Sequence, residues 1–120
     1  MTDEMLTVSR ADTAETVPVL AAAGEIDHDS REVLREAALL ALGDRGSRLV
    51  IDLGGVTFCD SGGLSLFVDL HRLTAARGGA VRLAGAQPIV LTVIQATNLD
   101  RLLAVHPSVE EAISASRAAD

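Results

Sequence analysis

The chain has 120 residues, of which 48% are hydrophobic but only 2% aromatic, and its formal net charge is −7. This length fits one domain. The acidic charge and the absence of lysine argue against direct nucleic-acid binding, because contact with a phosphate backbone needs clustered basic side chains. An acidic surface instead favours a basic protein partner. The single cysteine, Cys59, excludes an internal disulfide and fits a reducing compartment.

The start of the chain and its apolar runs indicate where the protein acts. Asp3 and Glu4 stand where a signal peptide carries positive charge, and no apolar run approaches the roughly 20 residues that cross a bilayer. We therefore expect a cytoplasmic protein without membrane insertion. We expect a single domain over residues 1–120, frayed at 1–4 and 117–120.

Two strands open the chain. Residues 5–10 alternate apolar and polar side chains, as in a half-buried strand. Residues 16–22 form a nearly continuous apolar run, which suits a more central strand. The polar segment 11–15 between them predicts the turn of a hairpin.

A helix follows the second strand. Asp29 predicts its N-cap, with Glu32 three residues later in a variant of the capping box, and Gly43 suits its C-terminal end. One face of this helix is expected to be apolar. The residues at helical spacing on that face are Val33, Ala37, Leu40 and Ala41.

The next strand and helix surround a glycine-rich loop. Residues 49–53 are a short apolar run with glycines on either side, which is typical of a strand buried on both faces. The following residues, 56–59, continue apolar as far as Asp60. A second helix is expected from Ser61 to about Arg77. Its apolar stripe comprises Leu64, Phe67, Val68, His71 and Ala75.

The remaining elements continue the alternation. Residues 80–84 predict a strand, and residues 102–105 predict a brief edge strand. Between them, Pro88 suits the first position of a helix ending near Thr97. The Ile, Val and Thr content of that segment equally supports a strand, and the helix is preferred because strands and helices already alternate.

A closing helix completes the order β-β-α-β-α-β-α-β-α. Ser108 and Glu111 predict its capping box. This order predicts an α/β (α+β) chain with one mixed sheet and helices packed against it. A full dinucleotide-binding fold is excluded, since the chain is too short and has no G-x-G-x-x-G sequence.

Residues 57–64, Thr-Phe-Cys-Asp-Ser-Gly-Gly-Leu, are the most unusual segment. Two glycines in the first helical turn lower helix stability, which suggests that something approaches the backbone closely. Ser61 either merely caps the helix or is a modifiable serine, because a phosphate is tolerated at a helix N-terminus. A hydrolase nucleophile elbow needs glycine where Cys59 stands, and a P-loop needs lysine, so neither motif is present.

Three segments resemble the STAS family of anti-sigma-factor antagonists, typified by SpoIIAA-like proteins. Residues 24–27, Gly-Glu-Ile-Asp, resemble that family's Gly-Glu-Leu-Asp at the end of the second strand. Residues 50–53 and 58–64 resemble its hallmark strand and Asp-Ser-Ser-Gly-Leu turn, which is the most specific match. Residues 97–99, Thr-Asn-Leu, stand where the family has Thr/Ser-Gly-Leu.

The resemblance implies a small sheet with helices mainly on one face, and a switch at Ser61. An anti-sigma factor that is also a serine kinase would phosphorylate Ser61, so ATP would belong to the partner and the chain would need no cofactor. The unphosphorylated form would bind this anti-sigma factor and release a sigma factor, and a PP2C-type phosphatase would reset the switch. The residues expected to contact the partner are Glu25, Asp27, His28, Thr57, Asp60, Gly62, Gly63 and Leu64.

Two departures from the family pattern stand out. Gly62 replaces the second serine of the turn, which removes a hydroxyl but leaves Ser61 in place. Asn98 replaces a glycine, and asparagine tolerates the left-handed conformation that a helix end requires there.

Two other functions are alternatives to the antagonist. A subunit of a lipid-transport ABC complex, resembling MlaB, also suits the Asp-x-Gly-Gly-Leu form of the turn. An enzyme with Ser61 or Cys59 as nucleophile lacks an identifiable base, so we expect no catalysis. The histidines His28, His71 and His106 lack ligand spacing, so no metal site is expected. We expect His71 to be packed in the core, and Cys59 to be buried rather than reactive.

Overall fold

The computed structural model of the protein describes residues 5–11 and 17–118, in which strands and helices follow the order expected from the sequence. The strands are β1 (Thr7–Arg10), β2 (Val19–Ile26), β3 (Arg48–Cys59), β4 (Ala80–Ala84) and β5 (Ala104–His106). The helices are α1 (Arg31–Leu42), α2 (Ser61–Ala76), α3 (Pro88–Ala96), the short 3-10 helix η1 (Leu99–Arg101) and α4 (Val109–Ala118).

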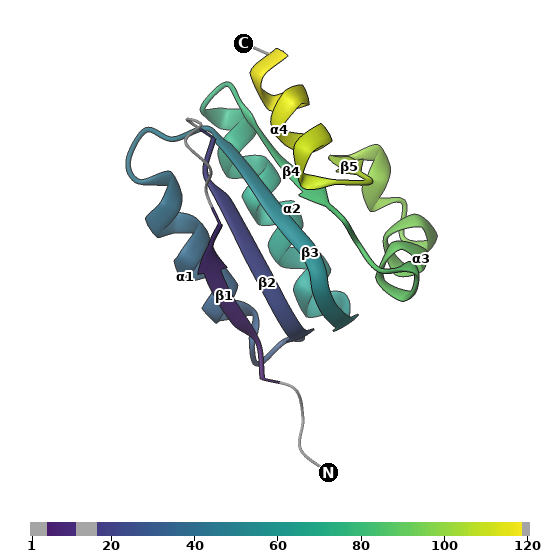
Figure 1. Cartoon of the computed structure of the whole chain (residues 1–120). Coiled ribbons are helices and arrows are strands. Elements are labelled where there is room, and N and C mark those ends of the chain that lie inside the picture. The colour runs from purple at the N-terminus through teal and green to yellow at the C-terminus, as the bar shows by residue number, and fades with distance from the viewer. Residues whose placement is uncertain (1–4, 12–16, 119–120) are drawn as a thin grey trace.

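The strands form one mixed sheet in the order β1-β2-β3-β4-β5 (Figure 1). Strand β1 is antiparallel to β2, which confirms the predicted hairpin, and the other neighbours are parallel. Most of the predicted hairpin turn lies outside the described residues. Parallel neighbours need crossover connections, and α1, α2 and α3 supply them.

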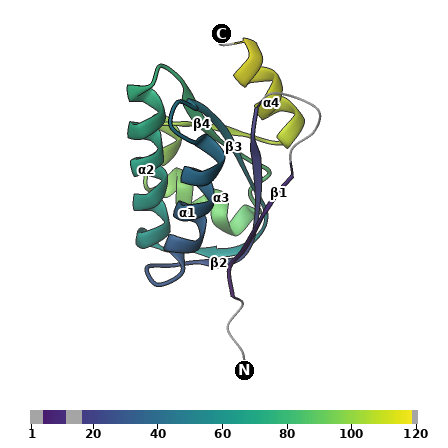
Figure 2. The same ribbon diagram turned by 90° about the vertical axis from the view of Figure 1, so that its left-hand side faces the viewer.

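The helices lie mainly on one face of the sheet, as expected. Helices α1, α2 and α3 cover one face and α4 covers the other (Figure 2). The larger core lies under the first three helices and includes Phe67, Leu34 and Ile94. A smaller cluster under α4 joins Val50 of β3 to Ala112.

The predicted apolar face of α1 was wrong by about one residue. The buried residues of this helix are Leu34, Ala38 and Leu42. In contrast, Val33 is 46% exposed and Leu40 is 84% exposed. The sequence does not decide which side of α1 faces the sheet, because the C-terminal half of the helix is almost uniformly apolar. In α2 the buried side includes Leu66, Leu70 and Thr74, while Ala75 is exposed and His71 is half-buried.

Strand β3 is longer than the sequence predicted. It continues through Gly54 and Gly55 to Cys59, because Ala23 and Gly24 of β2 pair with Gly55 and Val56. The register shifts between Ala21 and Ala23 in β2, so the strand pairing continues past the two glycines after a local bulge or irregularity. Tertiary pairing thus overrides the low strand propensity of glycine.

The ends of the last two α-helices confirm the sequence predictions. Pro88 begins α3 after the N-cap residue Gln87. Asn98 has φ 60° in the left-handed region, as expected where the family pattern has glycine. The backbone N–H of Glu111 donates to Ser108 Oγ at 3.2 Å, as the predicted capping box requires.

Candidate functional site

The segments that follow β2 and β3 meet at one edge of the sheet. The two strands are parallel, and their last residues, Ile26 and Cys59, are direct Cα partners. The backbone N–H of Asp60 donates to the Ile26 carbonyl oxygen at 3.1 Å. The loop of residues 27–30 therefore lies beside the start of α2 (Figure 1). The ends of β2 and β3 both fall within the sequence segments that resemble the STAS family.

Asp60, not Ser61, is the N-cap of α2. Its Oδ1 accepts hydrogen bonds from the backbone N–H groups of Gly62 at 2.8 Å and Gly63 at 3.3 Å. Ser61 is the first helical residue, and its side chain is exposed. No other described residue hydrogen-bonds the Ser61 hydroxyl, so the interpretation that this serine merely caps the helix was wrong.

Replacing Asp60 by Ala is expected to lower the free energy of unfolding by about 0.5–2 kcal/mol, because two helix N–H groups lose their acceptor. Asp69→Ala provides a matched control, since Asp69 is exposed on the same helix. Urea unfolding of both variants measures the difference. Equal stabilities of the two variants would contradict the capping role of Asp60.

The two glycines let the helix start sit tightly against β2 and the loop that follows it. A Cβ atom on Gly62 would lie 2.6 Å from His28 Cα and 2.8 Å from His28 N. A Cβ atom on Gly63 would lie 2.7 Å from both Cys59 Sγ and Ile26 Cγ2. Both glycines are buried. Their place in the turn thus follows from close backbone packing, and a docking partner would meet their neighbours instead.

Asp27 organises the neighbouring loop through a reciprocal pair with Ser30. The Ser30 N–H donates to Asp27 Oδ1 at 2.8 Å, and the Asp27 N–H donates to Ser30 Oγ at 3.0 Å. The Ser30 hydroxyl in turn donates to the Glu25 carbonyl oxygen at 2.9 Å. The prediction that Asp29 and Glu32 cap this helix was wrong: α1 begins at residue 31, and the Asp27–Ser30 pair fixes the turn before it.

The hydrogen bond from the Ser30 backbone N–H lowers the pKa of Asp27 below its ordinary value of 3.8. Folding therefore favours ionised Asp27. This stabilisation is complete above the ordinary value and is lost as the pH falls through the folded-state pKa. We expect Asp27→Asn to reduce stability at pH 7 and the difference from wild type to shrink below about pH 3.8. Denaturant unfolding of both proteins at pH 7 and below about pH 3.8 tests this prediction. The same difference in stability at the two pH values would refute it.

A polar bridge between α1 and α2 was not predictable from the sequence. Arg31 Nη1 donates to Ser65 Oγ at 3.0 Å, and the Ser65 hydroxyl donates to the Gly62 carbonyl oxygen at 3.1 Å. Ser65 lies one helical turn after Ser61, so this bridge brings a guanidinium group close to the turn that carries Ser61. The serine spacing was visible in the sequence, but the pairing with Arg31 depends on how the two helices pack.

The other expected contact residues lie around the same edge. His28 and Thr57 are exposed, and Glu25, Asp60 and Leu64 are half-buried. The Thr57 hydroxyl is 3.4 Å from the Gly24 carbonyl oxygen, to which it donates. The candidate site, which we call the switch surface, therefore comprises the ends of β2 and β3, loop 27–30 and the first turn of α2.

Comparison with known proteins identifies the family. A family model described as "Mlab, STAS domain" matches residues 9–104 of the chain. The chain belongs to the STAS family. The anti-sigma-B factor antagonist of Bacillus subtilis (strain 168) is 35% identical over 81 residues, which cover 68% of this chain and 73% of that protein.

Solved structures agree with the STAS assignment. An anti-sigma factor antagonist from Mycobacterium paratuberculosis is 27% identical and gives a TM-score of 0.83, covering 93% of this chain and 94% of that chain. SpoIIAA in its unphosphorylated form is 24% identical, with a TM-score of 0.76 over 93% of this chain and 97% of that chain, and shows the same fold.

One apolar residue of the STAS domain stands out beside the switch surface. Phe58 is 45% exposed and is the Cα partner of Glu25. This exposure was not predicted from the sequence, because an aromatic residue in an apolar run is ordinarily expected to be buried. Its exposure adds an apolar contact to a surface that is otherwise mostly polar.

Cys59 has the opposite environment. Its side chain is 4% exposed, and burial, followed by the negative charge of Asp60, raises its pKa to about 12. The thiol is thus protonated at neutral pH, which disfavours it as a nucleophile. Within the described residues, no three His, Cys, Asp or Glu side chains gather as ligands for a metal ion. None of the described helices is both long and apolar enough to span a bilayer.

Proposed function

We propose that this STAS domain is an anti-sigma-factor antagonist controlled by phosphorylation of Ser61. The unphosphorylated form binds an anti-sigma factor that is also a serine kinase, and this binding releases a sigma factor in the cytoplasm. The observation that carries the proposal is the position of Ser61: an exposed hydroxyl, without a hydrogen-bond partner among the described residues, next to the capping carboxylate of Asp60. The functional names of the relatives support the same class.

The geometry around Ser61 gives a physical basis for the switch. A phosphate adds about −1.5 to −2 charges at neutral pH. The N–H groups of Gly62 and Gly63 already donate to Asp60, so they are not available to neutralise it. In a docked complex the new charge would lie beside Asp60 and near ionised Asp27, and like charges or an unpaired charge at an interface cost several kcal/mol.

The proposed partners are those that the family resemblance implies. The kinase partner holds the ATP, so the STAS domain itself needs no cofactor and no catalytic residue. A PP2C-type phosphatase restores the unphosphorylated form by hydrolysing the exposed phosphoserine. Solved structures of SpoIIAA in an unphosphorylated and a phosphorylated form are both similar to this chain, which supports the proposal.

The alternative, an MlaB-like subunit of a lipid-transport ABC complex, shares the family but not the functional names of the matched relatives. Affinity purification from the source organism separates the two. We expect the wild-type protein and Ser61→Ala to recover an anti-sigma factor kinase, and Ser61→Asp to recover much less of it. Recovery of a membrane ATPase complex, equally by all three proteins, would overturn the antagonist function.

A further inference from the structure

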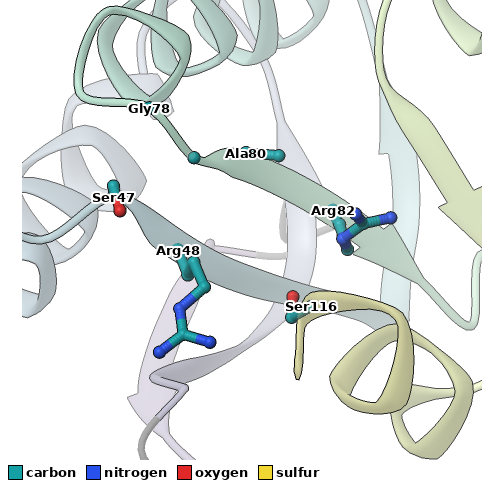
Figure 3. Close-up of a pocket in the computed structure, with 7 residues that line it drawn as sticks. Ser47, Arg48, Gly78, Ala80, Arg82 and Ser116 are labelled. Carbon is teal, nitrogen blue, oxygen red and sulfur yellow. The ribbon is translucent and has the colours of Figure 1, made fainter. Parts of the chain in front are cut away.

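A second polar site lies far from the switch surface. A pocket of about 130 Å³ opens at the beginning of β3 and β4, under the C-terminal end of α4 (Figure 3). Ser47, Arg48, Arg82 and Ser116 contribute its polar side chains. Strand β3 runs from this pocket to the switch surface, so the two sites stand roughly 35 Å apart along the strand.

The sheet register brings the two arginines of the pocket to the same face. Arg82 is the Cα partner of Val50, and Arg48 precedes Val50 by two residues on β3. Side chains two residues apart share a face of a strand, and Val50 packs under α4. The two arginines therefore stand one diagonal step apart on neighbouring strands, and Figure 3 shows their side chains extending from the strands in different directions.

Two polar atoms of the pocket are buried without a hydrogen-bond partner. They are Arg82 Nε and Ser116 Oγ. The Ser116 side chain is only 2% exposed, and in Figure 3 it reaches from α4 onto strand β3, in the region between the labelled side chains of Arg48 and Arg82. Buried donors without partners are rare in folded proteins, so each of these two atoms calls for a partner such as a water molecule or an ion.

The rest of the Arg82 side chain is held in place. Arg82 Nη1 lies 3.2 Å from His106 Nε2. Arginine only donates hydrogen bonds, so Nε2 accepts and the imidazole is neutral in this arrangement. Burial first, and then the positive charge of Arg82, lower the pKa of His106, which favours the neutral form. None of the described carboxylates forms an ion pair with Arg82, so its charge lacks a counter-ion in the described part of the protein.

We propose that this pocket binds a single small oxyanion of the phosphate or sulfate class. Arg82 Nε–H and the Ser116 hydroxyl donate to it, and Arg48 and Ser47 complete the polar wall. Donors from two strands and a helix line the pocket, and guanidinium and hydroxyl donors suit an oxyanion. The volume lies below the roughly 300–1,000 Å³ of pockets for larger organic ligands, so a nucleotide does not fit.

Titration with inorganic phosphate, followed by amide NMR spectra at constant ionic strength, tests the proposal. We expect saturable shifts at residues 47, 48, 79–82 and 116 for phosphate, and no saturation with chloride. Arg82→Gln and Ser116→Ala should each weaken binding at least about tenfold, because each removes a donor to a charged acceptor. Arg101→Gln and Ser114→Ala, at exposed positions, should leave binding unchanged.

The contrary results are equally specific. Shifts that do not saturate, an equal response to chloride, or full affinity in Ser116→Ala would show that the pocket holds only water. If Arg82→Gln fails to fold, Arg82→Lys decides, since it keeps the charge but lacks the Nε donor. A parallel titration with glycerol 3-phosphate represents a lipid headgroup. Tighter binding of that monoester than of free phosphate would overturn the assignment to a small free anion.

Discussion

The protein phosphorylated on Ser61 is expected to bind its anti-sigma factor at least about 100-fold more weakly than the unphosphorylated protein. The charge enters next to Asp60, whose Oδ1 already occupies the nearest helix N–H groups. A like-charge penalty of several kcal/mol, at about 1.4 kcal/mol per tenfold change in affinity, gives this magnitude. Isothermal titration calorimetry with the purified anti-sigma factor measures both dissociation constants.

The fold itself should tolerate the phosphate, because negative charge near a helix N-terminus is favourable. Thermal unfolding of the two forms is the control that separates lost docking from lost structure. Ser61→Asp should reproduce part of the loss of affinity, since it adds one charge rather than nearly two. Unchanged affinity of the phosphorylated protein, with its fold intact, would refute the electrostatic switch.

Gly62→Ser, which restores the serine of the family turn, is expected to destabilise this protein by about 1–3 kcal/mol. The new Cβ atom would lie 2.6 Å from His28 Cα, and a backbone atom cannot move aside as a flexible side chain would. Either α2 or loop 27–30 must shift. Urea unfolding measures the loss, and Ser61→Ala is the control, because Ser61 is exposed on the adjacent position of the same turn.

The same substitution also tests whether the loop belongs to the docking surface. If His28 and Asp27 contact the partner, a shifted loop should weaken anti-sigma factor binding in Gly62→Ser even where the protein remains folded. Stability equal to that of Ser61→Ala would show that the close approach of Gly62 to His28 is not required for the fold.

The order of strands and helices was predictable because glycine, proline and capping residues separate the periodic segments. The buried side of α1 was not predictable, since a helix that is apolar on several sides can present more than one face to a sheet. Likewise, nothing local distinguishes Gly55 in a turn from Gly55 in a strand. Its strand conformation depends on pairing with Ala23 of β2, which is distant in sequence.

The sequence pattern drew attention to the segments at the ends of β2 and β3, but it did not predict the hydrogen bonds between them. The segment around Ser61 stood out because two glycines follow a serine at a strand end. Whether Asp60 or Ser61 caps the helix depends on the backbone angles of the turn, for which both residue types are suitable. The Arg31–Ser65 bridge and the Arg82–Ser116 pocket join residues that are far apart in the sequence, so only the folded arrangement reveals them.

Phosphosite mapping by mass spectrometry tests the central claim most directly. The wild-type protein, Ser61→Ala and Ser65→Ala are each incubated with ATP and the anti-sigma factor kinase. We predict that wild type and Ser65→Ala gain one phosphate, located on residue 61, and that Ser61→Ala gains none. A phosphate on Ser61→Ala, or on Ser65 in the wild-type protein, would contradict the assignment of the switch to the first residue of α2.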